Sequence, residues 1–394
     1  AIRDIPARAR PLLTCWPAGR REPSSAMSST SLVCGGHSRP VPSVAYSAIV
    51  DGSFYLISGC LDGKCMLRYG KTGDWIGTFV GHKGAVWSAK LNGDATRAVT
   101  GSADYTAKLW DALNGDELAS FEHKRIVRTV DYAAAGDAVL TGGQEKLLRV
   151  FDVSRAAAAA SDAADGGDGG GDGGNGAAAR AADAKLTMSG HQHAIRSAQY
   201  VPSDANLVVS AAEHELRLWD LRTGDVVRDL APDEKAAIKD VSFTADGAHM
   251  VVAAGKQVRV ASTASWDVVK QHAFDINVST AAVSFVHNRF LVGFTDDLCV
   301  KVCDYESGDT LETHKGHHGP VHCLRYAPDF ATYASASEDG TIRLWLTEVR
   351  SYGLFHVVEP ATDSSAPTAA ADTAATTADA AATTADAAAT TADA

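Results

Sequence analysis

Residues 81–111 of this chain read GHKGAVWSAKLNGDATRAVTGSADYTAKLWD. The stretch opens on a Gly-His pair, carries Asp104 before its final apolar run, and closes on a Trp-Asp pair. A second copy at 316–345 has the same order, with Gly-His first, then Asp339, and a tryptophan at the end. Self-similarity at a fixed period is the signature of a repeat architecture, in which each repeat folds as one small unit. This repeat therefore decides the fold.

The position that Trp110 fills recurs along the chain. Successive occurrences are 42, 41, 68, 42, 42 and 42 residues apart. One interval is about 27 residues too long because a run rich in Ala, Gly and Asp interrupts it at 154–185. That run has almost no large apolar side chains, so we expect a disordered insert. Without it, seven repeats fill residues 31–358. The recurring position holds Arg68, Trp110, Phe151, Trp219, Ala261, Cys303 and Trp345.

Within a repeat, apolar and polar side chains alternate, as in Thr106–Trp110 and Thr341–Trp345. A period of two is typical of β-strands, and turn residues divide each repeat into four short strands. One four-stranded sheet cannot bury both of its faces, whereas seven sheets packed around an axis bury their faces on one another. We therefore predict an all-β chain folded as a seven-bladed β-propeller.

The composition is that of a globular chain, with 45% hydrophobic and 21% charged residues. No apolar run reaches the roughly 18 residues that cross a bilayer, so we expect no membrane association. The seven cysteines lack zinc-like spacing, and we expect neither a metal nor a cofactor. Cysteines used as small buried apolar residues are typical of a reducing, intracellular compartment. Six fall in strand-like or turn positions, namely Cys34, Cys60, Cys65, Cys299, Cys303 and Cys323.

Both ends of the chain lie outside the repeats. Residues 1–30 begin with Ala1, are rich in arginine and contain Met27, so we expect 1–26 to be upstream translation and 1–30 a non-native or disordered leader. An Arg-rich targeting segment is the alternative. Residues 359–394 repeat Ala, Thr and Asp every seven residues, but a coiled coil needs large apolar contact residues. We therefore expect a disordered tail.

Two repeats combine the residue types of a hydrolytic triad with a tryptophan. The repeat topology places the His before the innermost strand, the Asp between the second and third strands, and the Trp on the third. Because buried polar groups must find partners, we interpret each set as a network that fastens loops to strands, and we expect no catalytic residue. The alternative, an enzyme that uses one set, requires one repeat with an open pocket. The two sets are His82, Ser102 (or Thr100), Asp104 and Trp110, and His317, Ser337 (or Ser335), Asp339 and Trp345.

The other repeats carry unequal copies of this set. His37, His123 and His191 keep the His position, Glu145 replaces Asp in the third repeat, and Glu213 stands in the fourth, whose hairpin is one residue shorter. The fifth and sixth repeats lack the Gly-His pair. A unique active centre is not expected to recur in unequal copies, which favours the structural interpretation.

A second recurring position lies at the start of each innermost strand. Sevenfold geometry turns this position, which we call the rim slot, into a ring at one mouth of the central channel. Aligning the strands gives one residue per repeat, in the order Pro42, Trp87, Arg128, Arg196, Lys239, Ala281 and His322.

We predict that the partner-binding residues are Trp87, Arg128, Arg196, Lys239 and His322. The formal net charge of the chain is −12, so a basic cluster at this mouth has the opposite sign to the protein as a whole. Arg offers forked hydrogen bonds to carboxylates and Trp an anchoring surface, which favours an acidic peptide or protein segment. RNA is a weaker partner because overall acidity opposes the neutralisation of phosphates. Ordinary solvated strand ends are the alternative interpretation.

Topology also places two other segments. The insert follows the third strand of the third repeat, so we expect it on the face opposite the rim slot and dispensable for binding there. Either Ser31–Gly36 or Tyr352–Val358 must supply the outer strand of the last blade. We favour Ser31–Gly36, because the start of the chain can fill the gap that repeats beginning with an outer strand leave.

Four stretches carry a resemblance to a known family: GDWIGTFVGHKGAVW at 73–87, TAKLWD at 106–111, TGGQEKLLR at 141–149 and SYGL at 351–354. Together they resemble the serine-threonine kinase receptor-associated protein family of WD-repeat (WD40) proteins, over about residues 31–358. The insert, the tail and the leader depart from the family pattern.

The resemblance implies a non-enzymatic adaptor without a small-molecule substrate, located in cytoplasm and nucleus. It implies protein partners from the survival-of-motor-neuron complex, which loads Sm proteins onto spliceosomal small nuclear RNAs, with RNA contacted only indirectly. In animals it also implies receptor signalling. Subunit i of translation initiation factor three shares the seven-blade plan and is the alternative.

Overall fold

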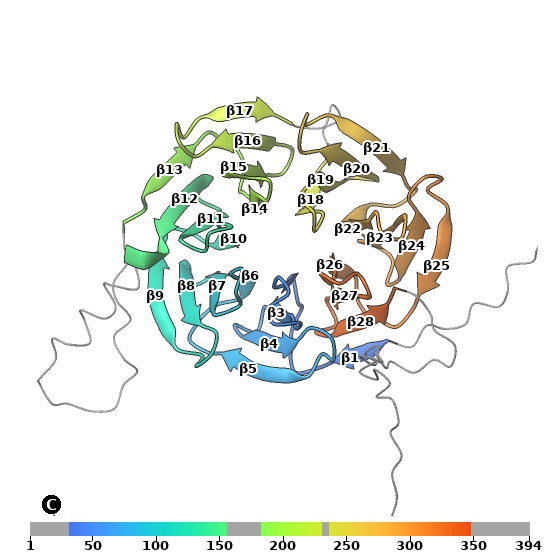
Figure 1. The fold of residues 1–394 in the computed structure, drawn as a ribbon, viewed down its shortest axis with the longest axis horizontal. Coiled ribbons are helices and arrows are strands. Elements are labelled where there is room, and N and C mark those ends of the chain that lie inside the picture. The colour runs from blue at the N-terminus through green and yellow to red at the C-terminus, as the bar shows by residue number, and fades with distance from the viewer. Residues whose placement is uncertain (1–30, 156–182, 231–235, 348–394) are drawn as a thin grey trace, which may run out of the picture. The chain divides into compact units, whose positions relative to one another are not determined.

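The computed structural model describes residues 31–155, 183–230 and 236–347. In this part of the chain, 28 strands form seven four-stranded antiparallel sheets. The sheets are arranged as blades around a central axis (Figure 1). The prediction of a seven-bladed propeller is confirmed. The predicted leader, most of the insert and the tail lie outside the described residues.

The blades follow the order of the chain, each running from an innermost to an outermost strand. Blade 1 comprises β2 (Ser43–Tyr46), β3 (Tyr55–Gly59), β4 (Cys65–Tyr69) and β5 (Trp75–Phe79). Blade 2 comprises β6 (Val86–Leu91), β7 (Arg97–Ser102), β8 (Thr106–Asp111) and β9 (Glu117–Glu122). Blade 3 comprises β10 (Val127–Tyr132), β11 (Ala138–Gly143), β12 (Leu147–Asp152) and β13 (Leu186–Ser189).

The second half of the ring repeats this plan. Blade 4 comprises β14 (Ser197–Val201), β15 (Asp204–Ala211), β16 (Leu216–Asp220) and β17 (Val226–Asp229). Blade 5 comprises β18 (Ile238–Phe243), β19 (His249–Ala254), β20 (Gln257–Ser262) and β21 (Val268–Ala273). Blade 6 comprises β22 (Val278–Ser284), β23 (Arg289–Phe294), β24 (Val300–Asp304) and β25 (Thr310–His314). Blade 7 comprises β26 (Val321–Tyr326), β27 (Thr332–Ser337), β28 (Ile342–Leu346) and β1 (Leu32–Cys34).

The position of Trp110 is structurally equivalent in all seven blades. Trp110 lies opposite Ala98 on the second strand of its blade, and each other member of the series occupies the same register. The pairs are Leu56 with Arg68, Val139 with Phe151, Val208 with Trp219, Met250 with Ala261, Phe290 with Cys303 and Tyr333 with Trp345. The period read from the sequence is thus the register of the third strand.

The amino-terminal strand closes the ring. β1 pairs antiparallel with β28, from Leu32 opposite Leu344 to Cys34 opposite Ile342. Arg343 adds a hydrogen bond from its guanidinium to the Ser31 hydroxyl at 2.9 Å. The expectation for Ser31–Gly36 is confirmed, and the alternative segment Tyr352–Val358 lies outside the described residues. Because β1 pairs with it, β28 is not left as an unpaired edge strand, which could pair with another molecule and cause aggregation.

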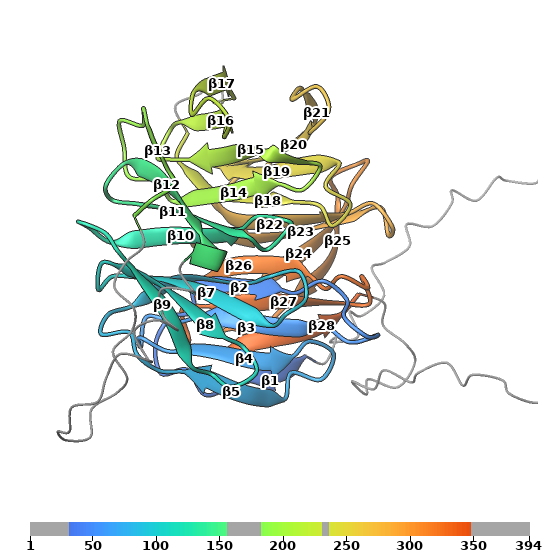
Figure 2. The same ribbon diagram turned by 60° about the vertical axis from the view of Figure 1, so that its left-hand side comes forward.

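Figure 2 shows the blades from an oblique direction. The hydrophobic core lies between neighbouring blades. One cluster joins Leu109 and Phe121 of blade 2 to Val139 and Phe151 of blade 3, all of them buried. Five of the six described cysteines are buried free thiols, and Cys299 is half-buried. Burying each sheet face against the next blade explains why a single repeat is not stable alone.

The insert interrupts blade 3 between its third and fourth strands. β13 pairs with β12 after the insert, and Lys185 already donates its backbone N–H to the Val150 carbonyl at 2.8 Å. The blade is therefore completed across the interruption, as the sequence predicted. In the described part of the chain, no helix is long and apolar enough to cross a membrane.

Candidate functional site

The recurrent polar set of blade 2 forms a continuous hydrogen-bonded chain. The Trp110 indole N–H donates to the Thr100 hydroxyl at 2.8 Å, and that hydroxyl lies 2.6 Å from His82 Nε2. His82 Nδ1 lies 2.8 Å from the Asp104 carboxylate. Because the indole can only donate and the carboxylate can only accept, the protons run in one direction: Trp to Thr, Thr to His, His to Asp.

Blade 7 repeats this chain with a serine. The Trp345 indole donates to Ser335 at 2.8 Å, Ser335 lies 2.7 Å from His317 Nε2, and His317 Nδ1 lies 3.0 Å from Asp339. The hydroxyl of this network is therefore Ser335, just as it is Thr100 in blade 2.

Of the two hydroxyls predicted for each network, the structure uses the alternatives, Thr100 and Ser335, and not the first choices, Ser102 and Ser337. Thr100 is two residues from Ala98, the residue opposite Trp110, which brings its hydroxyl within reach of the indole N–H. Ser102 lies two residues farther, at the end of β7, where it donates to the Gly84 carbonyl at 3.1 Å and accepts the Asp104 backbone N–H at 3.2 Å. Ser337 makes the same two contacts, with Gly319 at 2.8 Å and Asp339 at 3.3 Å. These serines hold the turn that carries the Asp.

The unequal copies of the polar set in other blades keep parts of this hydrogen-bonded network. In blade 4, His191 lies 2.6 Å from both Ser210 and Glu215, and Trp219 donates to Ser210 at 2.7 Å. The carboxylate is thus Glu215 and not Glu213. The turn between β15 and β16 is short, and Glu215 is its last residue, next to Leu216 at the start of β16.

In blade 3, His123 lies 2.9 Å from Thr141. Its other ring nitrogen faces the Phe121 carbonyl at 3.1 Å, while Glu145 bonds to the Lys124 backbone and to Arg149. Glu145 therefore occupies the expected turn without contacting the histidine. The network is complete only where an indole, a hydroxyl, a His and a carboxylate coincide.

Burial decides what these sets can do chemically. The His82 and His317 side chains are 2% and 1% exposed, and Trp110 is buried. Burial alone would raise the pKa of Asp104, but hydrogen bonds from His82, Thr106 and the Lys83 amide hold it well below its usual range. Burial lowers the pKa of His317, so the ring is neutral near pH 7. A buried His whose two ring nitrogens are bonded to a hydroxyl and a carboxylate of its own blade is a satisfied strut.

A possible metal-binding trio in blade 1 is a variant of the same strut. Ligand atoms of His37, Cys60 and Asp62 lie within 4.8 Å of one another. Cys60 stands where blade 2 has Ser102, donating to the Arg39 carbonyl at 3.1 Å and accepting the Asp62 N–H at 3.4 Å. Burial raises the pKa of the Cys60 thiol to about 12. Because backbone groups of the turn already engage the Cys60 sulfur and the Asp62 carboxylate, the trio is better explained as a hydrogen-bonded turn.

Four of the predicted rim-slot residues lie at β-bulges, whereas Pro42 and Arg196 directly precede their innermost strands. Register shifts separate Val86 from Ser88, Val127 from Thr129, Ile238 from Asp240 and Val321 from Cys323, so the residue between each pair is unpaired. Bulges re-aim a side chain out of the sheet. In blade 6 the bulge falls between Val278 and Thr280. Its rim-slot residue is therefore Ser279, and the assignment of Ala281 was wrong because this repeat lacks the Gly-His pair that anchors the alignment.

The structure brings together three of the five predicted binding residues. The Arg128 guanidinium lies over the Trp87 ring, 4.3 Å from its centroid. Burial, and to a lesser extent the charge of Arg196, lower the pKa of Arg128. Arg128 Nε and the Trp87 indole N–H are buried without a hydrogen-bond partner among the described residues. Trp87, Arg128 and Arg196 thus form a basic, aromatic corner between blades 2, 3 and 4.

The other two predicted residues stand apart from this corner. Lys239 is exposed and makes no hydrogen bond or ion pair with any described residue. His322 is half-buried and lies 3.7 Å from Glu338 of its own blade. The ring is therefore uneven, with its positive charge concentrated on blades 3 to 5.

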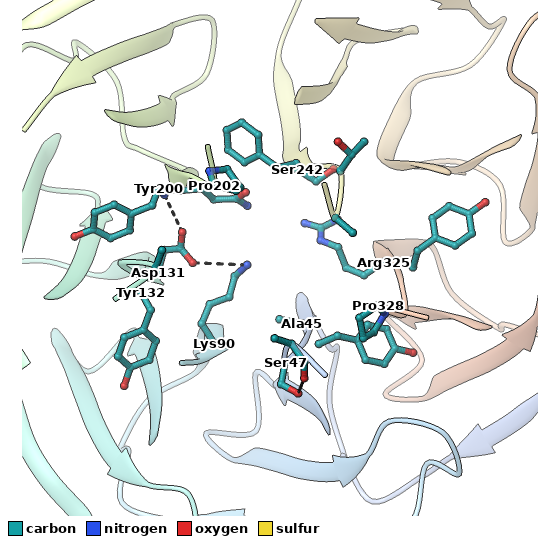
Figure 3. A pocket seen from close by; sticks show the side chains of 18 of the residues that line it. Ala45, Ser47, Lys90, Asp131, Tyr132, Tyr200, Pro202, Ser242, Arg325 and Pro328 are labelled. Atoms are coloured by element: carbon teal, nitrogen blue, oxygen red, sulfur yellow. Dashed lines mark hydrogen bonds and ion pairs between the residues drawn. The ribbon is translucent and has the colours of Figure 1, made fainter. Parts of the chain in front are cut away.

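The opposite end of the channel holds a cavity of about 390 Å³ that sequence reasoning missed. Figure 3 shows Lys90, Asp131 and Arg325 pointing into it. Lys90 lies 3.8 Å from Asp131, and Arg325 makes two contacts with Asp240 at 2.8 and 2.9 Å. A signal exists in the sequence: Lys90, Asp131 and Arg325 each stand four residues after the first buried residue of an innermost strand.

Polar side chains around this cavity join one blade to the next. Asp131 accepts the backbone N–H of Tyr200 at 2.8 Å, and the Gln199 amide donates to the Val241 carbonyl at 2.9 Å. Farther round, the Ser242 hydroxyl donates to the Ala281 carbonyl at 3.3 Å. These polar groups are largely occupied by structural bonds, so the cavity offers fewer free charges than the rim-slot corner.

The WD domain, G-beta repeat family model matches this chain at residues 73–111, 183–220 and 308–345. The human serine-threonine kinase receptor-associated protein is 41% identical over 340 residues, covering 86% of this chain and 89% of that protein. The protein of that name from Dictyostelium discoideum is 42% identical over 316 residues, covering 80% and 98%. Eukaryotic translation initiation factor 3 subunit I from Drosophila grimshawi is 27% identical over 332 residues, covering 79% and 95%.

Proposed function

Because this chain belongs to the serine-threonine kinase receptor-associated protein family of WD-repeat proteins, we propose that it is a non-enzymatic scaffold for protein partners. We further propose that these partners are Sm-loading components of the survival-of-motor-neuron complex, and that the protein works in cytoplasm and nucleus in the assembly of spliceosomal small nuclear ribonucleoproteins. The observation that carries the proposal is similarity over 86% of the chain to a named relative.

The absence of an enzymatic role is supported by the recurrent polar sets. Each candidate His is enclosed by a hydroxyl and a carboxylate or carbonyl within its own blade. General-base catalysis requires such a group to reach a substrate proton. Rigid blades with turns on both faces suit a scaffold instead, because binding then costs little ordering of the backbone.

The corner formed by Trp87, Arg128 and Arg196 is the partner site that we propose, with Lys239 and His322 as further contacts elsewhere on the ring. The two arginines raise the electrostatic energy of the free protein because their charges repel each other. A carboxylate-bearing segment removes this repulsion and gives each guanidinium a forked acceptor. The stack on Trp87 holds Arg128 in place before binding, which reduces the entropy lost on association.

Affinity purification of the full-length protein followed by mass spectrometry tests the proposed machine. Recovery of Sm proteins and survival-of-motor-neuron components supports it. Recovery of initiation-factor subunits instead would indicate a role in translation initiation, as the name of the 27% identical relative from Drosophila grimshawi suggests. Recovery of a serine-threonine kinase receptor would support a signalling-adaptor role, which at present rests on the name of the relatives alone.

Charge reversal tests the site. We expect the combined change Arg128→Glu, Arg196→Glu and Lys239→Glu to abolish recovery of at least one partner while the Tm stays near wild type, because all three side chains reach the surface. A matched control carries Lys71→Glu, Arg155→Glu and Arg222→Glu, which follow third strands on the other face. Retention of every partner by the first variant, or equal losses in both, would remove the corner as the site.

A further inference from the structure

An apolar groove lies beside the channel cavity, between the turns that follow the innermost strands of blades 5, 6 and 7. It has a volume of about 310 Å³ and shares Thr244, Ala245 and Pro328 with the cavity. Phe285 and Val286 of blade 6 form one wall and Phe330 of blade 7 another. Val286 is 70% exposed and Phe285 37%. Adjacent apolar side chains left open in this way are typical of a surface that binds something.

The groove walls are fixed in place. The His287 ring nitrogen lies 3.2 Å from the Phe330 carbonyl and ties the blade 6 turn to the blade 7 turn. Phe285 packs edge-on against Tyr305 and contacts the ring of His249, with centroids 4.9 and 4.5 Å apart. A groove with braced walls is formed before an occupant arrives.

Phe330 is an unusual residue for its backbone conformation. Its φ is +56°, in the left-handed region, and the turns after the innermost strands of other blades have Asp51, Ala95, Gly136, Gly247 or Asn288 with positive φ. A bulky residue is disfavoured there, and strain of this kind is retained where the side chain serves a purpose. Among the described turns of this type, only that of blade 7 has an aromatic residue at the positive-φ position, and its ring lines the groove.

The chain leaves the propeller next to this wall. β28 ends at Leu346, and Thr347 donates its backbone N–H to the Ala331 carbonyl at 2.9 Å. Ala331 directly follows Phe330. The residues after Thr347 read EVRSYGLF, so four residues precede the apolar stretch Tyr352–Phe355. Four residues span about 14 Å when extended, which lets Tyr352–Phe355 reach a wall that begins one residue from the anchor.

We propose that Tyr352–Phe355 of this same chain binds in the groove and covers Phe285, Val286 and Phe330. The stretch supplies three large apolar side chains, with Gly353 between the first two to let the backbone approach closely. Anchoring at Ala331 makes the binding intramolecular, so a short linker gives a high effective concentration. The occupant is therefore available at every protein concentration.

Hydrogen exchange of the full-length protein tests this proposal. In the variant Leu354→Asp with Phe355→Asp, we expect amides of the turns at 285–288 and 328–331 to exchange roughly tenfold faster or more, because two buried apolar contacts are lost. The matched control, Ala369→Asp with Ala370→Asp, adds the same charge farther along and should exchange like wild type. Equal rates in both variants and wild type would overturn the proposal.

A change in the groove itself provides the second test. Val286→Asp should release residues 352–355 to fast exchange, whereas Val269→Asp, at another exposed valine, should not. Both side chains point to solvent in the described structure, so neither change should prevent folding. Protection of the groove that rises with protein concentration would identify a second copy as the occupant, and protection that appears only with an added partner protein would identify that partner. Either result would replace the intramolecular assignment.

Discussion

The strut interpretation makes a quantitative prediction about Thr100. The hydroxyl of Thr100 accepts from the Trp110 indole at 2.8 Å and faces His82 Nε2 at 2.6 Å, and all three side chains are buried. Thr100→Val keeps the shape of the side chain but leaves the indole N–H and the imidazole nitrogen without a partner. Each orphaned buried group costs about 1–3 kcal/mol, so we expect the two to lower the free energy of unfolding by roughly 2–6 kcal/mol.

Trp110→Phe should cost less than Thr100→Val. It removes one donor and part of a buried ring, on the order of 1–3 kcal/mol, but Thr100 keeps its contact with His82. Blade 3 already holds Phe151 at this position, stacked on Phe121 with centroids 4.5 Å apart. The double variant should lose less than the sum of the two single losses, because the orphaned indole N–H is then absent.

Urea unfolding of the four proteins, followed by circular dichroism, measures these differences. Ser102→Ala is the matched control: its hydroxyl lies outside this hydrogen-bonded network. Its partners, the Gly84 carbonyl and the Asp104 N–H, belong to half-buried residues that water can reach, so its loss should cost about 1 kcal/mol. Partner recovery should be unchanged in every variant, since the struts do not reach the rim slot. If Thr100→Val were as stable as wild type, or less destabilising than Trp110→Phe, the directional network would be the wrong account.

Two further predictions concern acid stability and ring closure. Burial lowers the pKa of His123 to about 4, below its ordinary value of 6.5. The folded protein therefore binds this proton less readily than the unfolded chain does. The contribution of His123 to stability is complete above pH 6.5 and is lost as the pH falls towards 4, by up to about 1.4 kcal/mol per pH unit. The unfolding midpoint should fall less steeply over this window in His123→Gln, and identical pH profiles would contradict the assignment. Deleting residues 31–36 removes β1 and exposes the β28 edge, so we expect a lower Tm and concentration-dependent association by light scattering; a deletion variant with unchanged melting would show that β1 does not hold the ring.

The fold could be predicted because its signals are local and repeated. Apart from the closure of blade 7 by β1, strands pair with their neighbours in the chain. The same register recurs seven times, so an error in one repeat is corrected by the others. Counting residues along the repeat locates the position of Trp110, and counting strands per repeat shows that Ser31–Gly36 is needed to close the ring. Within one repeat, the choice between Thr100 and Ser102 was harder, because both face the same side of β7 and only the indole geometry separates them.

The same reasoning failed where a repeat loses its landmarks. Without Gly-His in blade 6, nothing in the sequence marks the bulge after Val278, and the alignment slipped from Ser279 to Ala281. In blade 4 the shortened hairpin moved the carboxylate from the expected Glu213 to Glu215. Both errors are shifts of two residues, which preserve the alternation of the strand and so leave the hydrophobic pattern unchanged.

The channel could not be predicted from any single repeat, because its contacts join different blades. Arg325 of blade 7 reaches Asp240 of blade 5, 85 residues away, past the blade that lies between them. Thr280 of that intervening blade also donates to the Asp240 carboxylate, at 2.6 Å. The effect of one residue here thus depends on residues in two other blades. Struts repeat because each is satisfied within its own blade, whereas channel and rim positions differ because each meets different neighbours, and these are the positions where propellers with the same struts can acquire different partners.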